Sequence, residues 1–239
     1  MEEDDFEPVD ASAITLDPAI TPEIFTQWRS PRFGASNPER MNNPFWEWMV
    51  RTRLDGFQAN EKLGSADSMQ AGPIWCFRRF GQSSTKLADG REILIGGEHE
   101  DFYDPDFYIY NDVVVKYPNG HVDIFGYPNE EFPPTDFHTA TPAGERIILI
   151  GALAHPAERK CGVTQILTLD LATMKIAMRA SRGANPGWIF EHEAQLSDDG
   201  GFIVVKGGQI AREPNTFVDN IDEWKLDLAT MGWQRLTAR

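Results

Sequence analysis

Long apolar runs and cysteine are scarce in this sequence of 239 residues. No apolar stretch approaches the roughly 20 residues of a membrane-spanning helix, so we expect no membrane partner. The two cysteines, Cys76 and Cys161, lack CxxC spacing and predict neither a zinc site nor a disulfide framework. One disulfide between them is an alternative, but we expect two buried, reduced thiols.

Positive charge is also scarce, with 22 Lys and Arg against 37 Asp and Glu and a formal net charge of −15. Such a surface repels a phosphate backbone, so we expect no nucleic-acid partner. The acidity favours a basic protein partner, or it serves solubility alone. The first residues, MEEDDFEPVD, lack the basic start and apolar core of a signal peptide. We therefore expect a cytoplasmic protein.

The strong catalytic signatures are missing as well. The sequence contains no HExxH, GxSxG, P-loop or GxGxxG pattern. We expect a non-catalytic protein without a cofactor, and we keep an enzyme with a less recognisable site as the alternative.

The N-terminal part differs from the rest of the chain in composition and in predicted secondary structure. Residues 1–41 combine an acidic start with several prolines, which predicts an extended or loosely ordered segment with a short helix beginning at Thr21. Residues 42–70 are expected to form a helical brace. Apolar side chains recur there at helical spacing from Asn43, a plausible cap, to about Lys62.

Residues 71–239 consist of short β-rich runs separated by Gly, Pro, Asp and Asn. The run KLADGREILI predicts a hairpin that turns at Asp89-Gly90, and KYPNGHVDIF predicts another that turns at Asn119-Gly120. Two successive hairpins predict a four-stranded antiparallel sheet.

This four-stranded unit repeats. In each copy a mostly apolar strand ends at a pair of small residues, and the pairs stand about 55 residues apart: Gly96-Gly97, Gly151-Ala152 and Gly207-Gly208. The run LDLATM occurs at 169–174 and again at 226–231. Repeats of this period with four strands each are typical of propeller blades. The predicted units cover about residues 76–130, 133–180 and 187–237.

The units resemble the kelch-repeat family of β-propellers. The resemblance rests on the apolar strand with its glycine pair (ILIGG, IVVKGG), on YNDVVV at the start of the third strand, and on EWKLDLATMGWQRL. Only the third unit keeps the tryptophan of this pattern, Trp233. The resemblance implies an all-β, kelch-like β-propeller or partial propeller of about three to four four-stranded antiparallel blades, with an N-terminal helical segment that covers an open flank. Two chains closing a six-bladed ring, and thus a homodimer, are the alternative.

The stretch GGEHEDFYDPDF, residues 96–107, connects the second strand of the first unit to the third. In kelch propellers such connections reach a face where partners bind, and three unlike loops on one scaffold are typical of a binding surface. We predict that these loops bind a basic protein, in a toxin-neutralising or adaptor role. A calcium site or an ordinary solvated loop are the alternatives. The predicted binding residues are Glu98, Glu100, Asp101, Tyr103, Asp104, Asp106, Phe107, Arg159 and Arg212.

His138 and His192 occupy the same position of the repeat, where the first unit has Gly81. This equivalence favours a structural hydrogen bond. The enzyme alternative, a hydrolase, isomerase or oxidase, would instead use the starts of the strands as an acid–base or zinc site. Its candidate catalytic residues are His138, His192, Glu191 and His99. The three histidines are also the candidate metal ligands, although we expect no bound metal.

Overall fold

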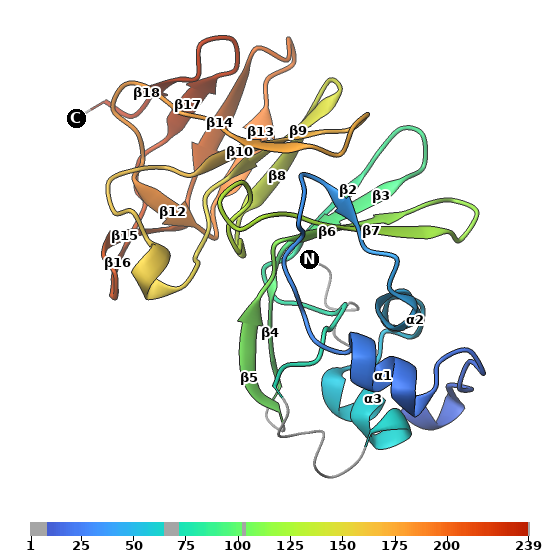
Figure 1. Ribbon diagram of the computed structural model, residues 1–239. Coiled ribbons are helices and arrows are strands. Elements are labelled where there is room, and N and C mark those ends of the chain that lie inside the picture. Colours follow the sequence, from blue (N-terminus) through green and yellow to red (C-terminus); the bar gives the residue numbers. More distant parts are fainter. Residues whose placement is uncertain (1–8, 65–71, 102–103, 239) are drawn as a thin grey trace.

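The computed structural model describes residues 9–64, 72–101 and 104–238, and most of its regular structure is β-strand (Figure 1). The strands form antiparallel sheets of two to five strands. Three of these sheets share one arrangement, in which four strands lie side by side in the order in which they occur along the chain. The expectation of a mainly β fold built from antiparallel four-stranded units is therefore confirmed.

The first sheet contains both predicted hairpins. Its strands are β2 (Ser83–Lys86), β3 (Glu92–Ile95), β6 (Asp112–Lys116) and β7 (Val122–Gly126), with β1 (Glu39–Arg40) added outside β7. The two turns place Gly90 and Gly120 at φ values of 86° and 83°. Glycine adopts this left-handed region without steric cost, which is why Asp-Gly and Asn-Gly mark these turns.

The second and third sheets repeat the first. Their strands are β8 (Thr139–Ala143), β9 (Arg146–Ile150), β10 (Ile166–Asp170) and β11 (Ile176–Met178), and then β13 (Glu193–Leu196), β14 (Phe202–Lys206), β17 (Trp224–Asp227) and β18 (Gly232–Arg235).

The two LDLATM copies form the same turn. Asp170 and Asp227 each accept a 2.8 Å hydrogen bond from the N–H of the threonine three residues later. Met174 and Met231 follow with φ values of 56° and 53°. Since the same residues take the same conformation at the same place in two sheets, the internal repeat is confirmed for these units.

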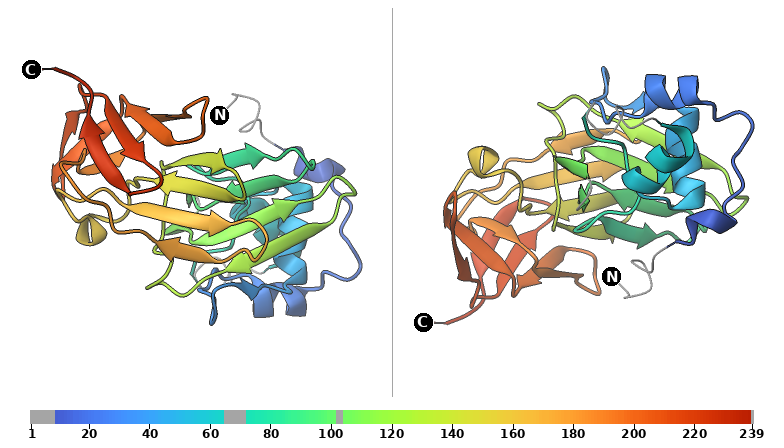
Figure 2. Two further views of the ribbon diagram at one scale, coloured as in Figure 1. Left: turned by 90° about the horizontal axis from the view of Figure 1, so that it is seen from above. Right: turned by 90° about the horizontal axis from the view of Figure 1, so that it is seen from below.

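The sheets pack face to face through alternate residues of their strands. In β9, Ile147 and Leu149 pack against the first sheet, whereas Ile148 and Ile150 pack against the third. This follows from the two-residue period of a strand. Strand β8 lies beside both β2 and β13, so the first strands of the three sheets are neighbours. The described residues thus form an open succession of three sheets, with helices at one end and the third sheet at the other (Figure 2).

The helical segment is divided differently from the prediction. Its helices are α1 (Pro22–Trp28), α2 (Pro44–Thr52) and α3 (Gly56–Leu63), preceded by the short 3₁₀ helix η2 (Ala11–Ala13). The predicted helix start at Thr21 and the predicted Asn43 cap are confirmed: the Thr21 side chain accepts from the N–H of Ile24, and the Asn43 side chain accepts from that of Trp46.

The single helix expected from Asn43 to Lys62 is wrong. Arg53 takes a left-handed conformation, with φ of 60°, and ends α2. Asp55 then caps α3 in a reciprocal capping box with Gln58. A capping box satisfies two backbone donors at once, so it favours a new helix start over continuation of the old helix.

The helices cover one face of the first sheet. Phe45, Trp46 and Met49 share a buried cluster with Leu94 and Val114 of that sheet. The stretch from 9 to 41 is likewise packed in place, in contrast to the loose segment expected from its prolines. Phe25 and Met41 are buried there, and β1 pairs with β7. Residues 1–8 lie outside the described part of the chain.

A buried polar network joins the helical segment to the first sheet. The Arg79 guanidinium donates to both carboxylate oxygens of Asp112, at 2.5 and 3.0 Å. The Trp75 indole N–H donates to the same carboxylate at 2.7 Å. Trp75 in turn stacks on Trp46 of α2, with ring centroids 5.1 Å apart. The network therefore couples the placement of α2 to that of β6.

The outer face of the third sheet is polar. Lys206 forms an ion pair with Glu193 at 3.1 Å, and the Lys225 ammonium lies 4.2 Å from the centroid of the Phe202 ring. Terminal units of repeat proteins characteristically carry such a polar outer face, because no further unit covers them.

Two further expectations concern cysteines and membrane spans. Cys76 is buried as expected, whereas Cys161 is exposed, which corrects the expectation of two buried thiols. No disulfide joins these two residues, both of which lie in the described part of the chain. Within that part, no helix has both the length and the apolar composition needed to cross a bilayer.

Candidate functional site

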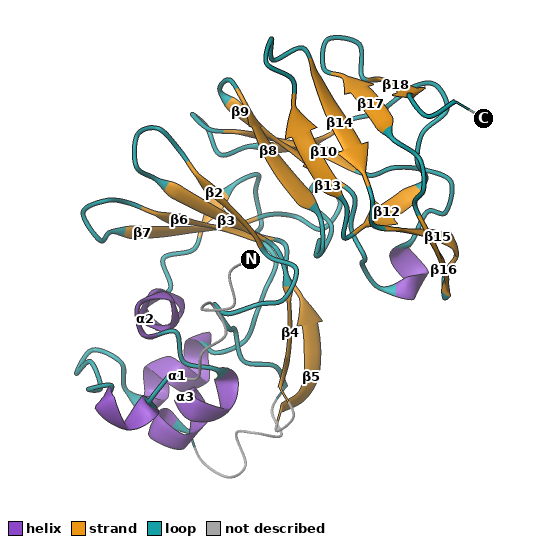
Figure 3. Cartoon of the chain, turned by 180° about the vertical axis from the view of Figure 1, so that it is seen from behind, coloured by secondary structure: helices purple, strands orange, loops and turns teal. Residues whose placement is uncertain are grey.

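The connections between the second and third strands of the three sheets lie on one side of the molecule (Figure 3). The first is the hairpin β4 (Glu98–Asp101) and β5 (Asp104–Ile109), and the third is the hairpin β15 (Gln209–Glu213) and β16 (Thr216–Asp219). The second contains a short 3₁₀ helix, η4 (Pro156–Glu158). The predicted loops are therefore largely regular structure, and the acidic stretch forms a hairpin in place of an open loop.

Side chains from all three connections meet. The Phe107 ring of β5 packs edge-on against His155, which precedes η4, with centroids 5.4 Å apart. Arg159, after η4, holds its guanidinium 4.9 Å from the centroid of Phe217 on β16 and donates to the Pro214 carbonyl oxygen. We call this surface, made by Phe107, His155, Arg159 and Phe217, the loop face.

The loop face leaves apolar side chains in contact with solvent. Phe107 is 38% exposed and Phe217 is 41% exposed. Beside η4 lies a recess of about 540 Å³, whose lining includes Trp188 of β12 (Trp188–Phe190), Val163 and Met178. Val163 and Met178 are 52% and 47% exposed. Neighbouring exposed apolar groups of this kind mark interaction surfaces more often than isolated ones do.

Arg159 is held rigidly at the centre of this face. Its guanidinium also donates to the carbonyl oxygens of Leu153 and Ala154, at 2.8 and 2.9 Å. Because its donors are directed at main-chain oxygens, Arg159 orders the second connection against the third. This role differs from that of a mobile charge awaiting a partner.

A carboxyl pair lies at the base of the first hairpin. The Asp136 side chain is fully buried and accepts the Ala154 N–H at 2.7 Å. Burial raises the pKa of Asp136, and burial together with the charge of Asp136 raises the pKa of Glu98 to about 7. Two carboxyl groups in contact favour sharing a proton, since both cannot easily carry charge. Near neutral pH, Glu98 is therefore only partly charged and differs from the open acidic contact predicted for a basic partner.

The other predicted binding residues lie on the hairpins of the first and third connections or outside the described part of the chain. Glu100 and Arg212 are exposed, on β4 and β15. The backbone places Asp101, Asp104 and Asp106 on the two strands of the first hairpin, but their side chains are outside the described part. Tyr103 lies outside the described residues altogether. The structure thus brings Glu98, Phe107 and Arg159 to the base and centre of the loop face.

A calcium site in the acidic stretch stays an untested alternative to the expectation of no bound metal. Among the residues that the structure describes, no three His, Cys, Asp or Glu side chains gather closely enough to hold a metal ion. The carboxylates on which a calcium site would depend belong mostly to the undescribed side chains of β4 and β5.

His138 and His192 make the predicted structural hydrogen bonds. Nε2 of His138 lies 2.8 Å from the Ser83 hydroxyl, and Nε2 of His192 lies 3.0 Å from the Thr139 hydroxyl. His138 directly precedes β8 and reaches the first residue of β2, and His192 directly precedes β13 and reaches the first residue of β8. Burial lowers the pKa of His138 to about 3 and that of His192 to about 4. Both rings are therefore neutral at physiological pH.

The counterpart of these histidines in the first unit is Gln82, which corrects the assignment to Gly81. Ser83 and Thr139 pair with Ile95 and Ile150, the residues that precede the strand-ending glycines of their sheets. This register places Gln82 level with His138. The Gln82 side chain donates to the Gly96 carbonyl oxygen at 3.3 Å.

The four residues of the enzyme alternative do not share one environment. His138 and His192 are both buried, and His192 contributes to the lowered pKa of His138. His99 lies on β4, with Nδ1 3.0 Å from the Arg78 carbonyl oxygen. Glu191 is exposed and takes a φ of 54°.

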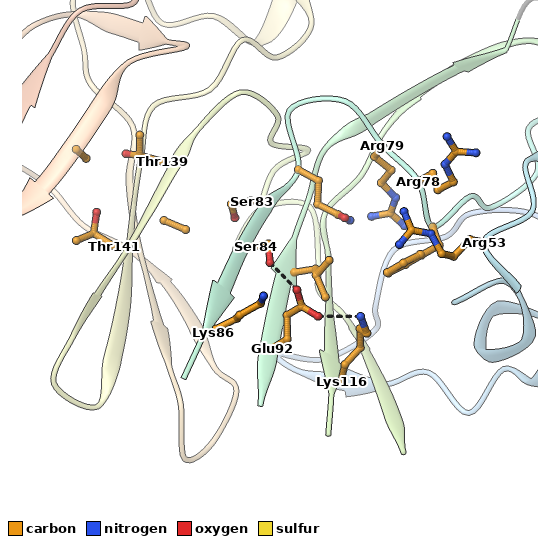
Figure 4. Close-up of a pocket in the computed structure, with 15 residues that line it drawn as sticks. Arg53, Arg78, Arg79, Ser83, Ser84, Lys86, Glu92, Lys116, Thr139 and Thr141 are labelled. Atoms are coloured by element: carbon orange, nitrogen blue, oxygen red, sulfur yellow. Dashed lines mark hydrogen bonds and ion pairs between the residues drawn. The ribbon is translucent and has the colours of Figure 1, made fainter. Parts of the chain in front are cut away.

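A second recess was not predicted from the sequence. It has a volume of about 590 Å³ and lies between Arg53, at the end of α2, and the first strands of the sheets (Figure 4). We call it the basic pocket because five of its lining residues are cationic: Arg53, Arg78, Arg79, Lys86 and Lys116. The observed strand pairing places Lys86 opposite Glu92, whereas the sequence predicted only the hairpin turn at Asp89-Gly90.

Fold and surface together define a repeat-built, mainly β protein of packed antiparallel sheets with an aromatic loop face. No protein-family model matches the sequence, and no curated protein matches it. Among solved structures, 115 chains match. One is a structure of YjhT, with a TM-score of 0.50 and 13% sequence identity.

The match to YjhT covers 67% of this chain and 52% of that chain. The present chain therefore spans about half the length of the YjhT structure. At this level of identity the likeness concerns the fold alone.

Proposed function

We propose that the protein is a non-catalytic, kelch-like binding module whose three sheets are the blades of a partial β-propeller. Three features support the blade interpretation: the common strand order, the contact between successive first strands, and the glycine after each second strand. Those glycines, Gly96, Gly151 and Gly207, have φ values of 59°, 77° and 64°. Residues with a side chain rarely adopt such values. Each second strand is therefore followed by glycine, the residue that tolerates this backbone conformation.

The module binds another protein through the loop face. The observation that carries this proposal is that exposed Phe107 and Phe217, from two different sheets, both contact the second connection, Phe107 through His155 and Phe217 through the fixed guanidinium of Arg159. Aromatic residues, Met and Arg are enriched at protein interfaces, and the energetically dominant contacts are usually aromatic or Arg anchors beside a pocket. The recess lined by Val163 and Met178 provides such a pocket.

The partner is basic. The formal net charge of −15 attracts a positively charged protein over long range and speeds its association. Binding without chemistry suits an adaptor or a toxin-neutralising protein, and cytoplasmic action is part of the same proposal.

The enzyme alternative has less support. His138 and His192 are buried, neutral and hydrogen-bonded to hydroxyl groups of neighbouring strands. A general base must reach the proton that it abstracts, and these rings are instead directed at structural partners.

The recess can be tested by placing a charge in it. Val163→Asp and Met178→Asp are each expected to reduce retention of the co-purifying partner at least tenfold, since a carboxylate would be desolvated in the interface. Leu236→Asp is the matched control, because Leu236 is 43% exposed and is not part of the recess lining.

The measurement is quantitative affinity capture with protein identification, at low and high salt. Circular dichroism and thermal melting establish that the variants fold. Folded Val163→Asp and Met178→Asp proteins that retain the same partners as the Leu236→Asp control would contradict the proposal.

A further inference from the structure

The outer strand of each four-stranded sheet is covered by another segment of the chain. Strand β1 pairs with β7, and the Asn37 side chain bonds both the N–H and the carbonyl oxygen of Ile176 on β11. Beside β18, the main chain of Arg182 accepts from the Trp233 N–H at 2.9 Å and donates to the Met231 carbonyl oxygen at 3.0 Å. Uncovered edges invite pairing with other chains, and these segments prevent it.

In the described part of the chain, no segment covers the outer edge of β16. This strand is the last of the three-stranded sheet formed by β12, β15 and β16, and it lies at the outside of the molecule (Figure 3). All four of its residues, Thr216–Asp219, are exposed. The edge of β16 is therefore open to an additional strand.

The pairing of β16 with β15 identifies the backbone groups that face outwards. The Asn220 N–H donates to the Gly208 carbonyl oxygen at 2.9 Å, which extends the β15–β16 ladder by one hydrogen-bonded pair. In an antiparallel ladder, such pairs alternate with pairs whose N–H and C=O groups point away from the partner strand. The register therefore directs Val218 towards β15. Asp219 and Phe217 direct their N–H and C=O groups to the open edge.

Side chains along this edge are apolar and acidic. Phe217 and Val218 are 41% and 38% exposed and project from opposite faces of the strand. Glu213 precedes β16 and Asp219 ends it; both are exposed, and neither belongs to an ion pair of the described residues. Arg212 is the only cation of β15 and β16.

A basic segment suits this edge better than a second copy of the chain does. Two copies each carry a formal net charge of −15, so their repulsion opposes edge-to-edge pairing. In antiparallel self-pairing, Asp219 at the end of one strand would also face the start of the other strand, next to Glu213. Like charges opposite each other destabilise a sheet, whereas lysine or arginine at the ends of a partner segment would pair with these carboxylates.

We propose that the protein partner contributes an extended, basic segment that pairs with β16 and lengthens the three-stranded sheet by one strand. Main-chain bonds to Phe217 and Asp219 supply affinity, and apolar or β-branched side chains beside Phe217 and Val218 supply specificity. This inference rests on the proposed function, because it specifies how the partner of the loop face is held.

A titration of the full chain, followed by nuclear magnetic resonance, tests the edge directly. The probe is the peptide Lys-Thr-Val-Thr-Val-Thr-Lys, which should shift the amide signals of Phe217 and Asp219 saturably and slow their hydrogen exchange. The Val218 amide, already bonded to β15, is the internal reference. The control peptides are Glu-Thr-Val-Thr-Val-Thr-Glu, which should bind more weakly, and Lys-Thr-Val-Pro-Val-Thr-Lys, which lacks a main-chain donor and should not bind.

Two outcomes of the titration would overturn the proposal. One is the absence of a saturable shift at these two amides with the basic peptide at millimolar concentration. The other is equal binding of all three peptides, since neither charge nor strand pairing would then decide the interaction.

A pair of variants isolates the backbone donor. Asp219→Pro removes one outward N–H, and proline is tolerated in an edge strand where the N–H faces solvent. Asp219→Asn is the matched control, since it removes the same charge and keeps the N–H. We expect Asp219→Pro to bind the basic peptide about fivefold or more weakly than Asp219→Asn does, because a peptide carbonyl loses its donor. Melting temperatures show that both variants fold, and equal binding by the two would overturn the proposal.

The same pair separates this inference from the proposed function. If Val163→Asp and Met178→Asp lose the captured partner while Asp219→Pro retains it as well as Asp219→Asn does, the edge proposal fails and the loop-face function stands. If Val163→Asp and Met178→Asp retain the partner, the proposed function is contradicted, and the peptide titration then upholds or overturns the edge proposal.

Discussion

At the scale of single residues, His138 and His192 connect the second and third sheets, respectively, to the preceding sheet. The side chains of His138 and His192 reach hydroxyls of the neighbouring strand. The main chain beside them does the same, since Phe137 N–H donates to the Gly81 carbonyl and Glu191 N–H donates to the Phe137 carbonyl, both at 2.9 Å. The repeat made the structural role of these histidines predictable, but only strand pairing identified Gln82 as their counterpart.

The buried histidines should make the protein sensitive to acid. Their pKa values of about 3 and about 4 lie below the unfolded value near 6.5, so the unfolded state binds more protons as the pH falls below 6.5. We expect each histidine to cost about 1–2 kcal/mol of the free energy of unfolding between pH 6.5 and pH 5. Urea unfolding at both pH values measures this loss.

Glutamine is the informative replacement, because Gln82 occupies the same position in the first unit. A His138→Gln, His192→Gln double variant should show a flatter dependence of stability on pH than the unaltered protein. An unchanged slope between pH 6.5 and pH 5 would contradict the assignment of this acid sensitivity to the two rings.

Glu98 should have the opposite effect at higher pH. Its pKa of about 7 exceeds the ordinary value of 4.5, so the folded state binds more protons between these values, and stability is lost as the pH rises through 7. Glu98→Gln should therefore stabilise the protein at pH 8 by about 1 kcal/mol, a value reduced for the partial exposure of the side chain. Denaturant unfolding at pH 8 checks this, with exposed Glu100→Gln as the control. Equal effects of both substitutions would argue against the carboxyl pair.

At the scale of elements, the contact between the helices and the first sheet includes one buried ion pair beside the apolar cluster. Arg79 and Asp112 are both buried, and the Arg79 guanidinium also lies 3.4 Å from the centroid of the Tyr110 ring. No sequence pattern indicated this pair, because its members stand 33 positions apart and meet only once β6 has joined the sheet.

Breaking this pair should be strongly destabilising. Asp112→Ala leaves a buried guanidinium without its carboxylate, so we expect a loss of about 3–5 kcal/mol in the free energy of unfolding. The control is Asp89→Ala, which breaks an exposed pair with Arg91 and should cost less than about 1 kcal/mol. Chemical denaturation measures both, and similar losses would refute the special role of the buried pair.

At the scale of the whole molecule, the two ends of the sheet succession are closed differently. The helices bury the outer face of the first sheet, whereas the third sheet presents Lys206, Glu193 and Lys225 to solvent. A ring of two chains would have to bury these charges, which is costly without matched partners.

We therefore expect a monomer of 27.0 kDa. Size-exclusion chromatography with light scattering at micromolar concentration measures the mass. A stable species of twice that mass would contradict this prediction and would favour the six-bladed ring.

The sequence by itself determined most strands of the three four-stranded sheets, the turns at Asp89-Gly90 and Asn119-Gly120, the Asn43 cap and the repeat, because these depend on local conformational preference and on the period of apolar residues. It predicted which connections would share a face, since equivalent positions of a repeat lie on the same side. Only the tertiary structure decided that Phe107 reaches His155 and that Phe217 reaches Arg159, which carboxyl faces Glu98, and that Lys86, Lys116 and Arg53 surround one pocket. These arrangements depend on how sheets and helices pack, and packing brings together residues whose separation along the chain carries no signal.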